Sequence, residues 1–332
     1  MRLEEERAAD RTRSRYDVVV VGGGAAGLSG ALALVRARRS VLVVDAGEPR
    51  NAPAAGIHAL LGNEGRPPAE FLAAGRAEVA GYGGEVVRGT VVSAERRDGG
   101  DLRVLLDDGT AVLADRLLVT AGLVDELPEV PGLAERWGRE VLHCPYCHGW
   151  EVRDQPVGVL STGPLSAHAA LLWRQWSPDV TLFLHTGPEP DDERYEELAA
   201  RGVAVVDGRI AAVEVTDDRL SGVRLADGRV IPVSALAVAS RLTARSGVLA
   251  GLGLEPVEQE VGGHVVGTSF AADPTGATAV PGVWVAGNVA NVLDQVSSAV
   301  AAGVRAGAAI NADLVAEETR RAVAIRRAAP TG

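Results

Sequence analysis

The sequence predicts an α/β fold of Rossmann-like domains, in which buried parallel strands alternate with helices. Near the N-terminus, residues 16–21 form a strand-sized apolar run that leads at once into a glycine turn and then a helical pattern over residues 28–38. Near the C-terminus, residues 281–286 form another strand-like run that enters a glycine turn, and an Ala/Gly-rich helical pattern follows over residues 295–310. A chain of 332 residues, 47% of them hydrophobic, is long enough for two domains with separate cores.

The first glycine turn has the spacing G-x-G-x-x-G, which is typical of dinucleotide sites. Gly22 allows a tight turn, Gly24 lets the backbone approach a pyrophosphate, and Gly27 lets the helix pack closely on the strand. The start of the helix, including Ala25 and Ala26, is expected to direct its backbone N–H groups toward the phosphates. A glycine turn with a purely structural role is the alternative.

A second strand, residues 40–44, ends at Asp45, where such folds place the acid that bonds an adenosine ribose hydroxyl. FAD and NAD share this fingerprint, so these residues alone leave the choice of dinucleotide open.

The C-terminal turn resembles the second FAD motif of flavoproteins that have two dinucleotide domains. The resemblance implies that Asn288, after Gly287, bonds the ribityl chain, and that the helix beginning at Gln295 and Val296 points its N-terminus at the flavin. That family usually has Asp at the position of Asn288, and an amide can also bond a hydroxyl. Residues 117–122, which end in Ala121 and Gly122, match the third landmark of this family, so FAD is the predicted cofactor.

Both cysteines of the chain lie in one motif, His143-Cys144-Pro145-Tyr146-Cys147-His148, and thiols spaced C-x-x-C can form a redox-active disulfide. Covalent haem, structural zinc and an inert buried thiol pair are alternatives. Neighbouring ligands suit a tetrahedral zinc site poorly, and the charged N-terminus lacks the apolar core of an export signal. We therefore predict redox chemistry and no metal.

The bulk composition excludes several other classes. The net charge is −11, with cationic residues scattered along the chain, which disfavours a nucleic-acid partner. Apolar runs are strand-sized, so we expect no membrane partner. A single redox motif without other cysteines favours a reducing compartment, and a cytoplasmic location is expected.

With these motifs, the chain resembles the low-molecular-weight thioredoxin reductases from about Tyr16 to about Ala322. The resemblance implies two Rossmann-like, three-layer (ββα) dinucleotide-binding domains, of which the FAD-binding domain is discontinuous. Residues 1–126 and 252–332 would form the FAD-binding domain, and residues 127–251 an inserted NADPH-type domain that carries the cysteines. It also implies a homodimer, with Cys147 facing the flavin and Cys144 exchanging with substrate. Arg50 and Asn51 are expected beside the cofactor, at its phosphates and its flavin end, unless they serve only as turn residues.

Two departures from that family guide the functional prediction. His148 replaces the usual Asp after the second cysteine and is expected to move protons, whereas His143 is a weaker candidate for which a structural hydrogen bond is the alternative. In the inserted domain, residues 161–166 read S-T-G-P-L-S instead of G-x-G-x-x-A, and residues 185–187 read H-T-G where the family has the H-R-R that grips a 2′-phosphate. The NADPH site is therefore predicted to be non-functional.

The run from Cys144 to Trp150 resembles the subgroup that closes disulfides in natural products, the dithiol oxidases of gliotoxin and holomycin biosynthesis. The resemblance implies a small-molecule dithiol substrate, with electrons leaving through FAD to O2 to give H2O2. An NADPH-dependent or otherwise reduced thioredoxin-type disulfide reductase is the first alternative. A non-catalytic flavin redox sensor is the second.

Overall fold

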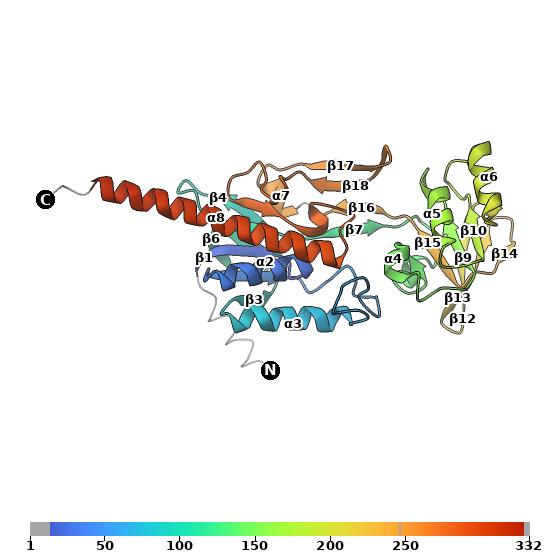
Figure 1. Cartoon of the computed structure of the whole chain (residues 1–332), viewed down its shortest axis with the longest axis horizontal. Helices are drawn as coiled ribbons and strands as arrows, with labels where there is room; N and C mark the ends of the chain where they lie inside the picture. Colours follow the sequence, from blue (N-terminus) through green and yellow to red (C-terminus); the bar gives the residue numbers. More distant parts are fainter. Residues whose placement is uncertain (1–13, 246, 329–332) are drawn as a thin grey trace.

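The computed structural model describes residues 14–245 and 247–328, so the expectation for the charged N-terminus lies outside the described residues. Two domains lie side by side and are joined by two strands (Figure 1). The large domain is built from both ends of the described chain, and the inserted domain carries the cysteines. This is the predicted arrangement of two α/β domains.

A seven-stranded sheet forms the centre of the large domain, in the order β3-β2-β1-β6-β5-β4 with β19 also paired to β6. Parallel pairing joins β1, β2, β3, β6 and β19, and antiparallel pairing joins β4, β5 and β6. The strands are β1 (Arg15–Val21), β2 (Val41–Asp45), β3 (Glu85–Arg88), β4 (Val91–Arg96), β5 (Leu102–Leu106), β6 (Ala111–Val119) and β19 (Val283–Val285).

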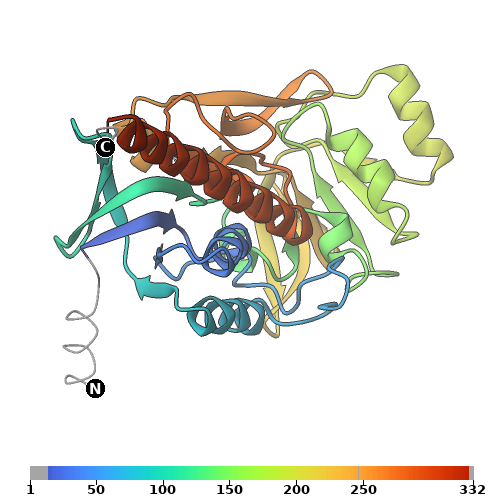
Figure 2. The same ribbon diagram turned by 60° about the vertical axis from the view of Figure 1, so that its left-hand side comes forward.

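Apolar cores cover both faces of this sheet, because its central strands are buried on both sides. Helices α2 (Ala25–Arg36), α3 (Pro68–Gly81) and α8 (Val296–Ala328) cover one face (Figure 2). The other core includes α7 (Gly247–Gly251) and part of a second, four-stranded sheet. That sheet has the order β17-β18-β16-β7, formed by β7 (Leu123–Glu126), β16 (Arg241–Ala244), β17 (Pro256–Val261) and β18 (His264–Phe270).

Helices α2 and α8 cross at very short range because both have glycines at the crossing. A Cβ added at Gly303 of α8 would lie 2.0 Å from the carbonyl oxygen of Ala26, and one added at Gly307 would lie 2.7 Å from that of Gly30. The absence of side chains therefore sets the distance between the helices. This crossing brings the N-terminal ends of α2 and α8 together.

The inserted domain repeats the three-layer plan with a parallel sheet in the order β11-β10-β9-β15-β8. Its strands are β8 (Val141–Leu142), β9 (Val157–Leu160), β10 (Val180–Phe183), β11 (Ala204–Val206) and β15 (Ala235–Val238). One core includes residues of helices α5 (Ser166–Trp173) and α6 (Asp192–Ala200), and a second lies under the antiparallel strands β12 (Ile210–Thr216), β13 (Arg219–Leu225) and β14 (Val230–Ile231). The short helix α4 (Pro145–His148) holds the cysteine motif.

The chain crosses between the domains through β7 and β16, which pair antiparallel in the four-stranded sheet of the large domain. The predicted return at residue 252 is therefore too late, because the chain rejoins the large domain at Arg241. The predicted boundary assigns the residues of α7 to the insert, but this helix packs on β4 of the large domain.

Helix α8 is longer than the predicted helical pattern and continues to Ala328, extending beyond the rest of the large domain (Figure 1). By length and composition it is the one helix among the described residues that meets the criteria for a membrane span. Its buried residues, which run from Ala299 to Leu314, pack in the core of the large domain.

The crossing predicts that Gly303→Ala destabilises the protein, although alanine is the better helix former. The added methyl group would overlap the backbone of Ala26, and we expect a loss of about 1–3 kcal/mol in the free energy of unfolding. Gly81→Ala in α3 is the matched control, because a Cβ there meets nothing within 4 Å. Denaturant melts of the two variants would contradict the packing argument if Gly303→Ala were as stable as the control.

Candidate functional site

The first glycine turn has the geometry of a phosphate-binding site. Gly22 has φ +101° and its N–H bonds the Val44 carbonyl at 2.8 Å, while a Cβ on Gly27 would lie 1.9 Å from the Gly22 oxygen. A Cβ at Gly24, by contrast, would meet nothing within 4 Å, so the backbone is open at the start of α2. Oδ1 of Asp45 accepts the N–H of Gly23 at 3.0 Å. The predicted turn and acid are therefore brought together.

Thr120 lies in the predicted landmark of residues 117–122, where sequence analysis assigned it no role, and it fastens this turn from the end of β6. Its Oγ1 lies 3.0 Å from the Val21 oxygen and 2.9 Å from the Gly22 oxygen. Ala121 and Gly122 follow directly, and Gly122 has φ +72° with open space around its Cα. The landmark at the end of this strand thus lies beside the glycine turn.

The C-terminal landmark faces the same place. Gly287 has φ +74°, and a Cβ there would lie 2.9 Å from the Cβ of Ala26 at the start of α2. Nδ2 of Asn288 donates to carbonyls of the following loop, at 3.3, 3.2 and 2.8 Å for residues 291, 292 and 294. These bonds use the amide nitrogen, and Oδ1 remains as the atom that suits a ligand hydroxyl.

The cysteine pair lies at the start of α8. Cys144 is the residue before α4, both thiols are free and half-buried, and the Cys147 N–H bonds the Cys144 carbonyl at 3.2 Å. Nε2 of Gln295, the residue before Val296 and α8, lies 3.9 Å from Sγ of Cys144. The predicted dinucleotide site and the predicted redox pair therefore adjoin. The described residues contain no group of three or more His, Cys, Asp and Glu side chains that could hold a metal ion.

The two thiols differ in acidity because they share one proton. The Cys147 thiol donates to Cys144, and this bond, assisted by backbone N–H groups of α4, holds the pKa of Cys144 well below its usual value. The same bond, together with burial and the negative charge on Cys144, raises the pKa of Cys147. In the reduced pair, Cys144 is therefore the thiolate.

His143 is half-buried, and its Nδ1 is a buried atom without a hydrogen-bond partner. Burial lowers the pKa of His143, helped by the positive charge of Arg50, while Asp125 and a backbone bond with Val238 act in the opposite direction. The buried Nδ1 is therefore available to bond a group of a ligand or substrate.

His148 ends α4 and is half-buried. Burial lowers its pKa, Glu151 raises it, and His58 and His143 lower it further. His58 belongs to the large domain, so residues of both domains meet beside the cysteines.

Arg50 is paired with a carboxylate in the structure, and its expected contact with the phosphates stays a prediction. Its Nε and Nη2 each lie 2.7 Å from a carboxylate oxygen of Asp125 in β7. The side chain of Asp125 is only 7% exposed, and it also accepts a hydrogen bond from Ser240 at 2.8 Å. The guanidinium of Arg50 therefore pairs with a buried carboxylate, which would be unfavourable without a partner. Asn51 contributes its carbonyl to a turn with Ala54, and its expected contact with the flavin end stays a prediction.

The second nucleotide motif is altered in the structure as in the sequence. Nδ1 of His185, at the end of β10, accepts the N–H of Ile210 at 3.0 Å, and a Cβ on Gly187 would lie 1.9 Å from Oγ of Ser161. Asp191 caps α6 through the N–H of Arg194 at 2.8 Å. Acidic and small residues therefore occupy the loop where a 2′-phosphate would need cations.

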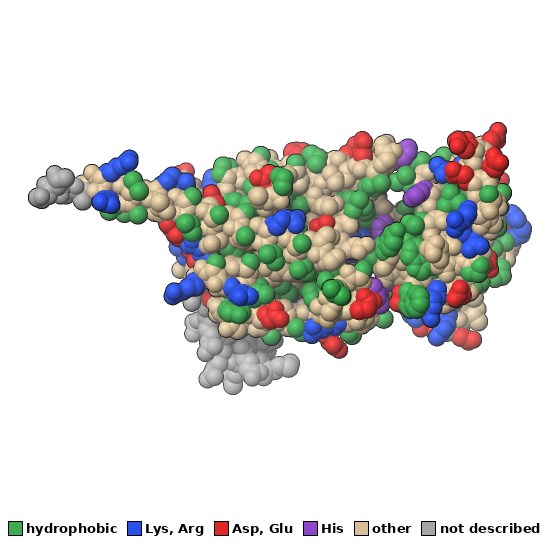
Figure 3. Space-filling view, in the orientation of Figure 1, with side chains coloured by type: hydrophobic (Ala, Val, Ile, Leu, Met, Phe, Trp, Pro, Cys, Tyr) green, Lys and Arg blue, Asp and Glu red, His purple; other side chains and the backbone are tan. Residues whose placement is uncertain are grey.

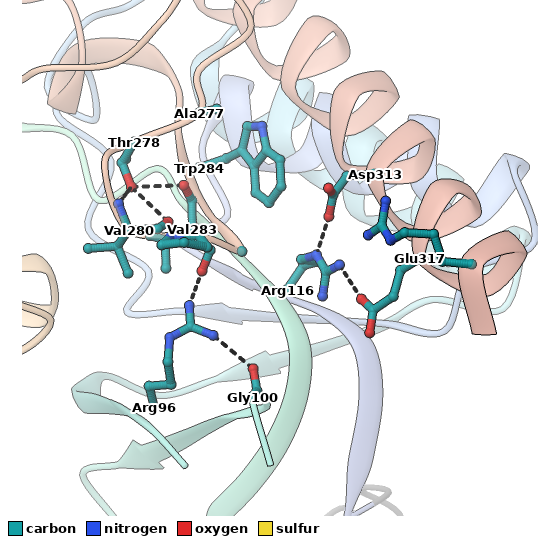
Figure 4. Close-up of a pocket in the computed structure, with 13 residues that line it drawn as sticks. Arg96, Gly100, Arg116, Ala277, Thr278, Val280, Val283, Trp284, Asp313 and Glu317 are labelled. Carbon is teal, nitrogen blue, oxygen red and sulfur yellow. Dashed lines mark hydrogen bonds and ion pairs between the residues drawn. The ribbon is translucent and has the colours of Figure 1, made fainter. Parts of the chain in front are cut away.

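A separate pocket of about 420 Å³ lies at the N-terminal end of β19, at the opposite end of that strand from Gly287 (Figure 4). Two arginines that line it are already engaged. Arg116 pairs with Asp313 at 2.6 Å and with Glu317, and Arg96 donates to the backbone carbonyl of Gly100 at 2.8 Å. This pocket does not include the cysteines.

The shared proton predicts how the reduced protein reacts with iodoacetamide. At neutral pH, Cys144 should be alkylated before Cys147, because only the thiolate reacts. In Cys147→Ala, which removes the donated bond, the pH midpoint for alkylation of Cys144 should rise, and Cys147→Ser, which keeps a donor, should shift it less. Peptide mapping by mass spectrometry checks both; equal midpoints in the two variants would contradict the assigned cause.

Comparisons with known proteins agree with this geometry. Residues 16–303 match the family model for pyridine nucleotide-disulphide oxidoreductase. Thioredoxin reductase tcpT of Claviceps purpurea is 30% identical over 92% of this chain and 96% of its own length, and thioredoxin reductase sirT of Leptosphaeria maculans is 31% identical over 90% and 94%. The crystal structure of HlmI matches with 44% identity and a TM-score of 0.88 over 96% of this chain and 99% of that one. The chain therefore belongs to the pyridine nucleotide-disulphide oxidoreductase family and is a flavin-dependent, thioredoxin reductase-like oxidoreductase.

Proposed function

We propose that the protein is an FAD-dependent dithiol oxidase that forms an intramolecular disulfide in a small-molecule dithiol, with O2 as the electron acceptor. The observation that carries this proposal is the contrast between its two nucleotide sites. The site beside Cys144 keeps the open Gly24 backbone and the Asp45 acid, whereas residues 185–187 of the inserted domain read H-T-G in place of the H-R-R that grips a 2′-phosphate. Electrons would then enter through sulfur.

FAD suits the large domain because the two helix N-termini and the ribose acid lie around one open stretch of backbone. When bound, FAD supplies the two-electron acceptor that restores the Cys144–Cys147 disulfide and passes the electrons to O2, which becomes H2O2. Asp45 would hold the adenosine ribose, the N–H groups of α2 the pyrophosphate, and Asn288 the ribityl chain.

The thiol chemistry starts from the oxidised pair. A substrate thiolate attacks Sγ of Cys144, the Cys144–Cys147 bond breaks, and Cys147 leaves as a thiolate. The second substrate thiolate then attacks the substrate sulfur of the mixed disulfide and displaces Cys144. The substrate loses two protons and two electrons and becomes a disulfide, and the enzyme pair gains the two electrons.

The acidities of the two cysteines suit these steps. A thiol of low pKa leaves readily. Once the Cys147 thiolate has taken up a proton lost by the substrate, its thiol donates to Cys144 and gives Cys144 that property in the second step. In the reduced pair, the negative charge on Cys144 contributes to the raised pKa of Cys147. In the mixed disulfide Cys144 carries no charge, so this contribution is absent. Cys147 is therefore a better leaving group in the first step than its raised pKa in the reduced pair suggests.

His148 remains the expected proton acceptor for the incoming thiol, because burial lowers its pKa and the neutral ring can accept a proton near neutral pH. His143, the residue before Cys144, is the second candidate. Its Nδ1 has no hydrogen-bond partner, and its pKa is lowered as well.

The surroundings of the pair suit an apolar substrate. Tyr146 and Trp150 are 61% and 65% exposed although both belong to the cysteine segment. In Figure 3, a hollow between the two domains has hydrophobic side chains on both sides, with histidines among them. Large exposed aromatic side chains beside a reactive group are typical of ligand sites.

A thioredoxin-type disulfide reductase is the second candidate, because relatives of this chain carry that name. It requires electrons to enter from NADPH or another reductant and to leave through the cysteines. The direction of electron flow separates the two candidates.

Anaerobic mixing of the flavin-loaded protein with dithiothreitol should bleach the flavin within the enzyme's turnover time, whereas NADPH should not. In air, dithiothreitol should yield equimolar H2O2. Cys147→Ser, which lacks the attacking thiol, should do neither. Fast bleaching by NADPH would overturn the proposal in favour of the reductase, and no bleaching by dithiols would overturn the oxidase.

The role of His148 predicts a change in pH dependence. His148→Gln should lower the rate of flavin reduction by dithiothreitol roughly 100-fold and remove the acidic limb of the pH–rate profile. That limb should lie below the ordinary pKa of histidine, because the pKa of His148 is lowered and the neutral base persists to lower pH. His168→Gln, at an exposed position of α5, is the control. An unchanged acidic limb in His148→Gln would assign the base elsewhere.

A further inference from the structure

A tight loop of the large domain, residues 57–66, presents His58 to the inserted domain. Its ends pair through Ile57 and Arg66, whose N–H and carbonyl bond at 2.8 Å, and Gly65 bonds back to Ile57 at 2.8 Å. Ala59 has φ +57°, a conformation that costs energy for a residue with a Cβ. The loop therefore holds a strained residue directly after His58.

Glu64 fixes the ring of His58. One carboxylate oxygen lies 2.6 Å from Nδ1 of His58, and the other accepts the N–H of Ala59 at 2.9 Å. The bond with His58 lowers the pKa of Glu64, so this carboxylate is charged and Nδ1 carries a proton. The orientation of the imidazole is thus set from within its own loop.

The other ring nitrogen faces the cysteine segment. Nε2 of His58 lies 3.5 Å from Oε1 of Glu151, which follows His148 and Trp150 in the inserted domain. Both Glu151 and His58 influence the ionisation of His148. The side chain of His58 is 20% exposed and lies between two carboxylates that reach solvent, Glu151 at 42% and Glu64 at 65%.

We propose that His58, positioned by Glu64, relays protons with Glu151 between the half-buried cysteine site at His148 and solvent. The inference rests on the proposed function for its substrate but adds a residue and a role that the cysteine motif does not contain. His58 is a positioning residue with a relay role, because it acts through Glu151 and His148. The titratable groups that face it are Glu64, Glu151 and His148.

Over a full turnover, the two protons that the dithiol loses equal the two that O2 takes up when it becomes H2O2. The dithiol releases its protons when it is oxidised, whereas O2 takes up protons in the later half-reaction, so a route between the site and solvent serves both half-reactions. A neutral imidazole that is protonated on Nδ1 accepts a proton at Nε2, the nitrogen that faces Glu151, and releases one at Nδ1 toward the exposed Glu64. One ring then transfers a proton outward without rotating.

His58→Gln tests the relay because glutamine keeps a hydrogen-bonding side chain but cannot transfer a proton between two nitrogens. Anaerobic flavin reduction by dithiothreitol should slow roughly 100-fold, and added imidazole should restore much of the rate. The solvent deuterium isotope effect should increase in this variant. His264→Gln, an exposed histidine of the β17–β18 hairpin, is the matched control and should behave as the wild type in all these measurements.

Glu64→Gln gives a second, independent measurement. It removes the charge that orients the ring while leaving the imidazole in place, so the rate should fall less than in His58→Gln and imidazole should have a smaller effect. Thermal melts of all variants, run in parallel, report on folding.

The outcomes separate the two proposals. A wild-type protein that is not reduced by dithiothreitol would overturn the proposed function itself. A wild type that is reduced, with His58→Gln as fast, would overturn only the relay. A slow His58→Gln variant that imidazole does not restore, with a lowered melting temperature, would assign His58 a purely structural role and also overturn the relay.

Discussion

The close crossing of α2 and α8 is the constraint on which the site depends. Each helix directs an N-terminus at the same open stretch of backbone, and this requires that Gly303 and Gly307 let the two helices approach within backbone contact of Ala26 and Gly30. A helix N-terminus carries a partial positive charge, and two such ends near one point favour an electron-rich ligand. Because Gln295 at the start of α8 also contacts Cys144, the same crossing fixes the distance between the nucleotide site and the thiols.

Charge and burial give different properties to residues that look equivalent in the cysteine motif. The cysteines differ because one donates its proton to the other, and the two histidines of the motif differ in their surroundings. His143 is half-buried with one buried nitrogen unpaired, whereas His148 lies among titratable residues contributed by both domains. The altered second nucleotide site is consistent with this division, since chemistry that begins at sulfur needs no hydride donor.

The sequence alone was sufficient to predict those features of the site that depend on a few neighbouring residues. The glycine turn and the acid Asp45 each depend on a few neighbouring residues, and both are present. The pairing of Arg50 with a buried carboxylate of β7 was not predicted, because its partner Asp125 is distant in sequence. The contact of His58 with Glu151 joins two domains, and the fastening of the turn by Thr120 joins two strands, so neither has a sequence signature. The α8 crossing was likewise hidden in an ordinary run of small residues.

The pairing of β7 with β16 has an architectural consequence. Glu126 and Arg241 stand directly opposite each other in the antiparallel ladder, so the chain leaves the large domain and re-enters it at almost the same point. A short reverse turn would span that gap, as it does between the strands of a β-hairpin. The cysteine-bearing module is therefore portable in a topological sense: it can be removed or exchanged at a single locus while the fold that receives it keeps every one of its own strand neighbours.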